Sequence, residues 1–233
     1  MDDDLDFDFE EFEREFEREC EQHEKEMDTL NAQLDNAFEW MDLLFDLQSS
    51  IERFNENMNS LNLGIESQKK ESEPNCFLYG TLLIGIISAY EGFIHELFNA
   101  CCNKTDYIKD ALLNIKKLTS EDARHLKIST KKTLSEGELK QKLLSATLHD
   151  PIQISRLSER LFGLKMPTIK NDFSKKLLEL RNAFTHNNGY LGGEYVKPSY
   201  HDAKTVHHLF VALVNGYVNS ITKNADVDLE SMK

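Results

Sequence analysis

The sequence predicts an all-α protein, a helical bundle preceded by a long N-terminal helix. The chain has 233 residues, of which only 10 are Gly and 4 are Pro, too few breakers for an all-β sandwich or barrel. Apolar residues recur at steps of three and four over residues 9–61, which is the helical period. A nearly uninterrupted apolar stretch, residues 76–90, then predicts a buried central helix. With 40% hydrophobic residues, the chain can form one large domain, or one domain with an appendage.

The first predicted helix, residues 9–61, has two unlike halves. Its mean apolar step is about 3.5 residues, so part of it has the pattern of a coiled-coil seam. In residues 10–26 nearly every residue outside the seam is charged, which predicts solvent around most of the circumference. In residues 37–47 the apolar stripe is broad enough to dock on a core.

Charge is distributed unevenly along the chain. The net charge is −14, but residues 1–28 hold 15 acids and 3 bases, so the acidic arm carries most of it. Residues 104–176 carry 16 Lys and Arg against 9 Asp and Glu. A basic face is what contact with nucleic acid requires, although lysines that merely solvate helix surfaces explain the excess equally well.

These patterns divide the chain into five segments. We expect an acidic arm that starts the long helix (1–28), the remainder of that helix docked on the core (29–62), a loop (63–75), a helical domain (76–222) and a disordered tail (223–233). The apolar stretch at 76–90 is shorter than the roughly 20 residues of a membrane span, so no membrane contact is expected. Its glycines, Gly80 and Gly85, indicate close approach of a neighbouring helix.

Helix boundaries in the second half of the chain follow from capping patterns. Ser135 with Glu138 and Ser199 with Asp202 predict capping boxes, and Pro151 suits a first helical turn. Asn187 to Gly189 predict the end of an amphipathic helix over 168–186.

Neither a metal nor a cofactor is expected. The four cysteines form no CxxC pair, and the acidic N-terminus is the opposite of a signal or transit peptide, so a cytoplasmic protein with reduced thiols is predicted. His201, His207 and His208 do not have the spacing of a metal site and are expected at a surface or interface. No phosphate-binding loop, GxSxG or HExxH motif occurs.

One segment, LLELRNAFTHNNG (177–189), carries candidate chemistry. Arg181 and His186 lie five residues apart near the predicted helix end, with Asn182 directly after the arginine. On a straight helix the two side chains diverge by about 140°, so one chain makes no obvious Arg/His clamp unless the helix ends near His186, whereas two chains around a two-fold axis could pool both residues in one cleft. Glu91, an ionisable residue in an apolar helix, requires a partner; Arg181 or Asn182 would serve, and a lysine of the basic middle equally well.

This segment resembles the R-x4-6-H signature of the HEPN superfamily, and residues 89–94 are similar to an earlier helix of that fold. The resemblance covers roughly residues 76–222, in helix order more than in sequence. Arg18 and His23 repeat the spacing, but they lie within a long helix among glutamates that would repel a phosphate, so we reject that copy.

The resemblance implies a HEPN-like, metal-independent endoribonuclease that dimerises around a shared cleft, an RNA-binding hydrolase of the toxin or anti-phage defence type. Arg181 and His186 would then be catalytic, with Asn182 and Glu91 supporting them. The implied partners are RNA, a second copy of the chain, and an antitoxin or defence-complex subunit at residues 1–28. Toxins of the superfamily often carry a modified Tyr two residues after the His; Asn188 stands there instead.

Two alternatives remain open from the sequence. The chain could be a non-catalytic HEPN-like module that binds RNA or a nucleotide, or that serves as an assembly subunit of a defence complex. It could also be a coiled-coil adaptor in which residues 9–61 are the functional part.

Overall fold

The structure, a computed structural model, describes residues 9–70 and 75–231, with side chains from residue 13 onward, and confirms the predicted all-α class. The elements in chain order are α1 (Phe9–Lys69), α2 (Cys76–Asn103), α3 (Thr105–Asn114), the 3₁₀ helix η1 (Ile115–Lys117), α4 (Ser120–His125), α5 (Glu136–Ser145), α6 (Pro151–Phe162), α7 (Asn171–His186), the short antiparallel strands β1 (Tyr190–Leu191) and β2 (Glu194–Tyr195), and α8 (Tyr200–Glu230).

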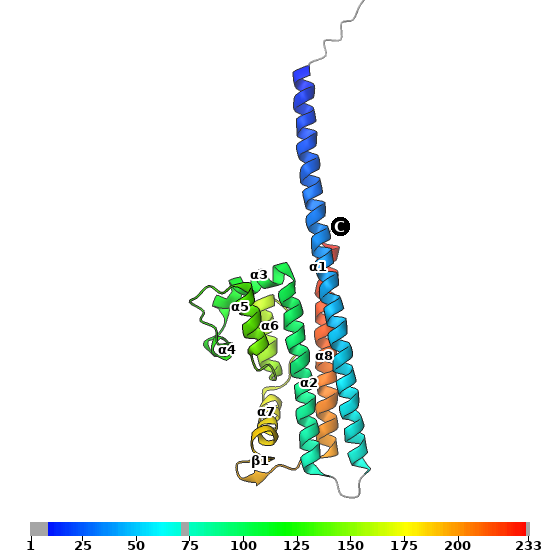
Figure 1. Ribbon diagram of the computed structural model, residues 1–233, viewed down its shortest axis with the longest axis vertical. Coiled ribbons are helices and arrows are strands. Elements are labelled where there is room, and N and C mark those ends of the chain that lie inside the picture. Colours follow the sequence, from blue (N-terminus) through cyan, green and yellow to red (C-terminus); the bar gives the residue numbers. More distant parts are fainter. Residues whose placement is uncertain (1–8, 71–74, 232–233) are drawn as a thin grey trace, which may run out of the picture.

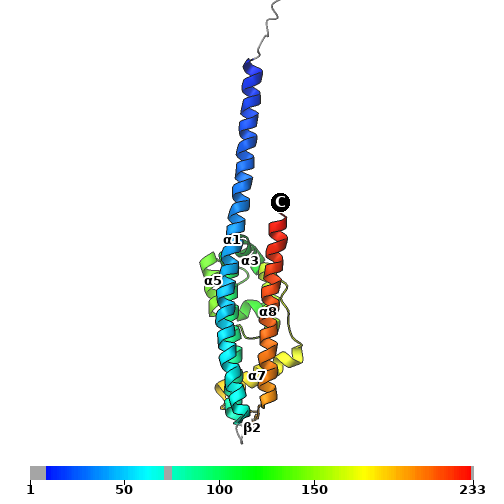
Figure 2. The ribbon, with the colours of Figure 1, turned by 90° about the vertical axis from the view of Figure 1, so that its right-hand side faces the viewer.

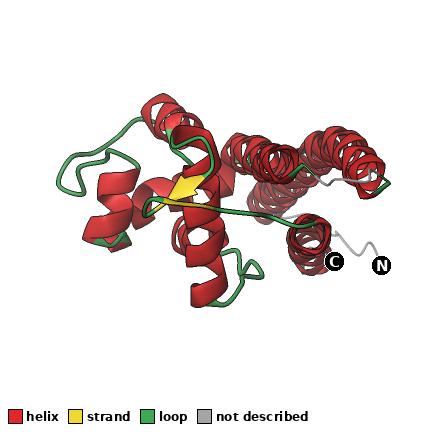
Figure 3. Cartoon of the chain, turned by 90° about the horizontal axis from the view of Figure 1, so that it is seen from below, coloured by secondary structure: helices red, strands yellow, loops and turns green. Residues whose placement is uncertain are grey.

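Three long helices, α1, α2 and α8, run side by side and form the main bundle (Figure 1). The shorter helices α3 to α7 and the β1–β2 hairpin lie on the other side of α2, as the end-on view shows (Figure 3). The buried Tyr90 of α2 and Tyr217 of α8 join their hydroxyl groups at 2.7 Å inside this core. Helix α2 is therefore the central element on which both layers pack.

The length and hydropathy of α2 would also suit a membrane span. Among the described residues, α2 is the one helix that passes this test, with 28 residues and a mean hydropathy of 1.6 over its most apolar window. A buried core helix passes the same test, and α2 packs against α1, α7 and α8. Its apolar composition is thus accounted for by contacts within the chain.

The predicted loop at 63–75 is wrong over its first half, because α1 continues to Lys69. Ile65 extends the apolar stripe of the helix and is fully buried. Glu66 accepts a hydrogen bond from the Tyr200 hydroxyl at 2.9 Å and pairs with Lys204 at 3.0 Å. Cross-helix contacts of this kind hold a polar segment helical; residues 71–74 lie outside the described residues.

The predicted disordered tail at 223–233 is also wrong, because α8 continues to Glu230. Ala225 is buried, and the Asp228 carboxylate accepts hydrogen bonds from Trp40 Nε1 at 2.6 Å and Asn36 Nδ2 at 3.0 Å. These bonds hold the pKa of Asp228 below its usual range despite its partial burial. Residues 232–233 are not described.

Beyond this junction α1 extends alone as an arm (Figure 2), and residues 13–32 are all exposed. A buried cation marks the point of departure: Lys104 Nζ donates to Asn36 Oδ1 at 2.5 Å and lies 4.9 Å from the centre of the Trp40 ring. The side chain of Lys104 is only 1% exposed. A cation so deeply buried requires these partners, so the junction has one defined geometry.

The predicted caps are confirmed. Both capping boxes form, at Ser135 and at Ser199, and Pro151 is the first residue of α6. The glycines of α2 also lie at close contacts: a Cβ on Gly85 would be 2.7 Å from Leu61 of α1, which confirms the predicted close approach of a neighbouring helix.

Candidate functional site

The candidate site is the C-terminal end of α7. His186 is the last helical residue, and the chain turns directly after it, with Asn188 in a left-handed conformation at φ 50°. Gly189 N–H closes the turn on the carbonyl of Ala183 at 2.9 Å. The helix therefore ends where the sequence predicted, and the imidazole stands at its exposed tip.

This helix end is held tightly against α2 through Phe184. A Cβ on Gly80 would lie 2.1 Å from the Phe184 ring, so only glycine permits this contact. The rings of Phe77 and Tyr195 also border Phe184, with centroids 6.1 and 6.4 Å away. Side chains presented from this turn are thus fixed to the core of the protein.

Arg181 and His186 have few partners within the chain. Arg181 is half-buried and its Nη1 lies 3.5 Å from Asn182 Oδ1, while Asn182 and His186 are exposed. Within residues 9–70 and 75–231, neither Arg181 nor His186 takes part in an ion pair. Their polar groups are therefore available to a ligand. Because α7 includes His186 as its last residue, the two side chains diverge by about 140° as on an ideal helix and do not converge in one chain.

Among the described residues, Glu91 does not pair with Arg181 or Asn182, as the sequence had suggested, nor with a lysine. Its Oε1 accepts a hydrogen bond from Leu148 N–H at 2.8 Å and lies 4.0 Å from His95 Nε2 and 3.9 Å from His149 Nδ1. The carboxylate thus faces the loop between α5 and α6. It stands about 16 Å along α2 from Gly80, where α7 is anchored, so it forms a separate cluster.

The surroundings of Glu91 decide its ionisation. Burial raises the pKa of this carboxyl, but the His149 ring, the Leu148 N–H and the His95 ring favour the anion and together lower the pKa. Glu91 is therefore ionised at neutral pH and fixes the α5–α6 loop onto α2. The signal that sequence reasoning missed was His149, which is close in space and 58 residues away along the chain.

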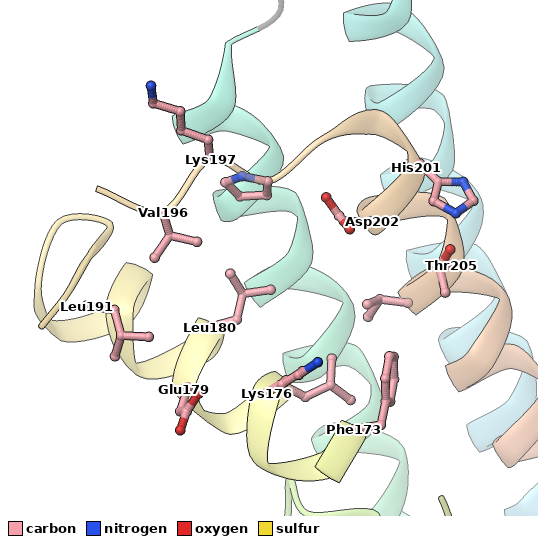
Figure 4. A pocket seen from close by; sticks show the side chains of 13 residues that line it. Phe173, Lys176, Glu179, Leu180, Leu191, Val196, Lys197, His201, Asp202 and Thr205 are labelled. Carbon is pink, nitrogen blue, oxygen red and sulfur yellow. The ribbon is translucent and has the colours of Figure 1, made fainter. Parts of the chain in front are cut away.

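A cavity of about 410 Å³ lies between α7, the hairpin and the start of α8 (Figure 4). Apolar and charged side chains share its lining: Phe173, Lys176, Leu177, Glu179, Leu180, Leu191, Val196, Lys197, Pro198, His201, Asp202, Thr205 and Val206. Neither Arg181 nor His186 is among them. The lining of this cavity therefore does not bring the candidate Arg/His pair together.

Exposed aromatic side chains surround the candidate helix end. Phe77 is 49% exposed and Tyr190 is 50% exposed. The Tyr190 ring packs edge-on against Tyr195, which in turn borders Phe184. Sequence reasoning did not predict this aromatic group.

Some of the Lys and Arg residues of the basic segment 104–176 form ion pairs within the fold. Arg156 and Arg160 both bind the fully buried carboxylate of Asp122, at 2.7 and 3.0 Å. Burial raises the pKa of Asp122, but these guanidinium groups and the Thr119 hydroxyl outweigh it and hold the pKa low. With Lys104 buried, three of the cations counted in this segment already have partners within the fold, although Arg156 and Arg160 are partly exposed.

The histidines of α8 behave differently from one another. His207 is buried rather than at a surface, and its Nε2 lies 3.0 Å from the Met58 carbonyl of α1, whereas His208 is exposed. No group of three or more His, Cys, Asp or Glu is arranged to hold a metal in the described part of the chain. Cys101 and Cys102 are buried in α2, as small apolar residues would be.

Comparison with known proteins adds no assignment. No protein-family model matches the chain, and no significant match exists among curated proteins or solved structures.

Proposed function

We propose that the protein is a HEPN-like, metal-independent endoribonuclease in which Arg181 and His186 from two copies act on one RNA phosphodiester. The observation that carries this proposal is the end of α7. The guanidinium of Arg181 and the imidazole of His186 are presented there from the last turns of a helix anchored to α2, with no ion pair of their own among the described residues. Such side chains are suited to bind a polar substrate, because they are charged or titratable, are held rigidly and have no ion-pair partner among the described residues.

The chemistry requires only these two residue types. One His186 takes the proton from the 2′-OH, the 2′ oxygen attacks the adjacent phosphorus, and the P–O5′ bond breaks. The departing 5′ oxygen receives a proton from the second His186, and the products carry a 2′,3′-cyclic phosphate and a 5′-OH. Histidine titrates near neutrality and can act as base or acid, and arginine offers a forked donor pair to the phosphorane oxygens.

Two copies are needed because the two side chains diverge on one helix. A two-fold arrangement through the face that carries residues 169–186 would bring the Arg181 of one chain towards the His186 of the other. The exposed aromatic side chains at this end, Phe77 and Tyr190, offer apolar area for such a contact or a surface on which a base stacks. The role as a toxin or anti-phage effector rests on the resemblance to the superfamily.

The test is cleavage of mixed RNA by the purified protein in EDTA. Arg181→Ala and His186→Ala should each lower the rate about 10²- to 10⁴-fold, since each removes a group acting in the transition state. Arg181→Lys should also impair cleavage, because it keeps the charge and loses the fork. DNA should resist, since it lacks the 2′-OH.

The chain supplies its own matched control. Arg18 and His23 have the same spacing but lie exposed in the arm, so Arg18→Ala with His23→Ala should leave the rate unchanged. Cleavage that requires Mg²⁺ and leaves 5′-phosphates would overturn the assignment.

One observation favours a second candidate, a non-catalytic RNA- or nucleotide-binding module. The cavity beside α7 does not include Arg181 or His186 in its lining. RNA binding that weakens in Arg181→Ala, without any cleavage by the unaltered protein, would support this candidate over the nuclease.

A further inference from the structure

The arm of α1 carries an apolar seam that faces solvent. Met27 is 53% exposed, and Leu30 and Leu34 are each 48% exposed. Together with Phe16, Cys20 and His23 they recur at alternating steps of four and three residues, which places all six on one side of the helix. Helix α8 ends beside Asn36 and Trp40, so it does not cover this stretch (Figure 2).

A helix with such a seam is not expected to persist alone in water. Helices in proteins gain most of their stability from packing an apolar face, and contiguous exposed apolar residues mark interaction sites. The alternating step is that of a coiled coil, in which the seam packs against a second helix. The arm therefore has the pattern of one strand of a coiled coil.

The residues that flank the seam determine what that second helix can be. In the heptad set by Cys20 and Met27, the flanking positions that contact a partner between Phe16 and Met27 are Glu17, Glu19, Glu24 and Glu26, and all four are exposed. In a parallel pair of arms Glu19 would face Glu24 of the other copy, and an antiparallel pair would likewise set glutamate against glutamate. Like charges at these positions disfavour pairing, so a second copy is a poor occupant.

We propose that the seam of the arm docks a basic amphipathic helix of another protein, with apolar residues at its seam and Lys or Arg at its flanks. Charge complementarity with the four glutamates selects this partner over a second copy. The proposal is independent of the nuclease assignment, because it involves none of the residues at the end of α7.

The probe is a synthetic four-heptad peptide with Leu at the seam positions and Lys at the flanks. Binding to the full-length protein is followed by fluorescence anisotropy at low and high salt. A peptide with Glu in place of each Lys is the reference ligand. The Lys peptide should bind at least about tenfold more tightly than the Glu peptide. High salt should reduce this difference in affinity, because the ion pairs between peptide lysines and arm glutamates are exposed to solvent and are screened.

Two variants with equal charge change locate the interaction. Glu19→Lys/Glu24→Lys/Glu26→Lys reverses three flanks and should weaken the Lys peptide about tenfold while strengthening the Glu peptide. Glu15→Lys/Glu21→Lys/Asp28→Lys alters the opposite side of the arm by the same charge and should have a clearly smaller effect. Met27→Gln/Leu30→Gln should weaken both peptides, since it removes apolar contact from the seam.

Three results would overturn the proposal. These are equal affinity for the two peptides, equal effects of the two charge variants, and self-pairing of the arm. Self-pairing would be detected as a Cys20–Cys20 disulfide that forms on mild oxidation and disappears in Met27→Gln/Leu30→Gln. Because the arm is remote from α7, RNA cleavage by each variant reports separately on the nuclease assignment.

Discussion

The two halves of α1 have the same apolar period and opposite surroundings. In the bundle half, Met58 is 1% exposed between α2 and α8; in the arm, Met27 is 53% exposed. Both residues occupy the apolar stripe of one continuous helix. A period of three and four residues therefore predicts a helix and its apolar face, but it does not predict which parts of that face the chain itself covers.

The residues beside the stripe distinguish the halves. Polar side chains of the bundle half reach neighbouring helices: Arg53 binds Glu96 of α2 at 2.9 Å, and Glu66 binds Lys204 of α8. In the arm the corresponding contacts stay on the same helix, as in the bond from Gln22 to Glu26. Polar side chains whose partners lie on other helices therefore mark the docked half of α1.

The largest expected difference between the halves is in stability. Met58→Ala should lower the free energy of unfolding by about 2–5 kcal/mol, because it leaves a cavity in a packed core. Met27→Ala should change it by less than about 0.5 kcal/mol, because that side chain loses little burial. Urea denaturation followed by circular dichroism measures both values. Similar losses in the two variants would mean that the arm packs against something in solution.

Much of the fold could be predicted because local signals determine it. The capping boxes at Ser135 and Ser199 set helix starts within a few residues, and the apolar run at 76–90 identified the central helix. The ends of α1 and α8 were missed because distant residues decide them: Tyr200 reaches Glu66, and Trp40 reaches Asp228. Composition cannot reveal a bond between residues that far apart in the chain.

The candidate site shows the same limit. The end of α7 follows from Asn187 to Gly189, which lie next to it in sequence, and the structure has it there. The partner of Glu91 depends on where the α5–α6 loop passes over α2, so residues chosen by charge alone gave the wrong pairing. Contacts between layers required the folded chain.

A smaller change in the free energy of unfolding tests how tightly the bundle half of α1 packs against α2. Gly92 is exposed within α2 with open space around a Cβ, so Gly92→Ala should raise the free energy of unfolding by about 0.5–1 kcal/mol through helix propensity. Gly85→Ala should not raise the free energy of unfolding in this way, because its Cβ would lie 2.7 Å from the end of the Leu61 side chain and the contact would offset the gain in helix propensity. The same urea titrations compare the two. Equal stabilisation by both would show that Leu61 moves aside at no cost.

The smallest expected effect is a pH dependence confined to the bundle half. Burial lowers the pKa of His207, and Lys204 and His208 lower it further, whereas the Met58 carbonyl partly opposes them. As pH falls from 7.5 to 5.5, the unfolded chain takes up this proton more readily than the folded protein, so the free energy of unfolding falls. Carboxylates remain ionised in both states over most of this window and contribute little to the change in stability.

The variant His207→Gln keeps a donor for the Met58 carbonyl and does not titrate. It should therefore reduce the loss of stability between pH 7.5 and pH 5.5 by an amount below about 1 kcal/mol. His23→Gln, in the exposed arm, should leave the loss as it is in the unaltered protein. If His207→Gln and His23→Gln lose equal stability on acidification, the buried histidine does not distinguish the bundle half of α1 from its arm.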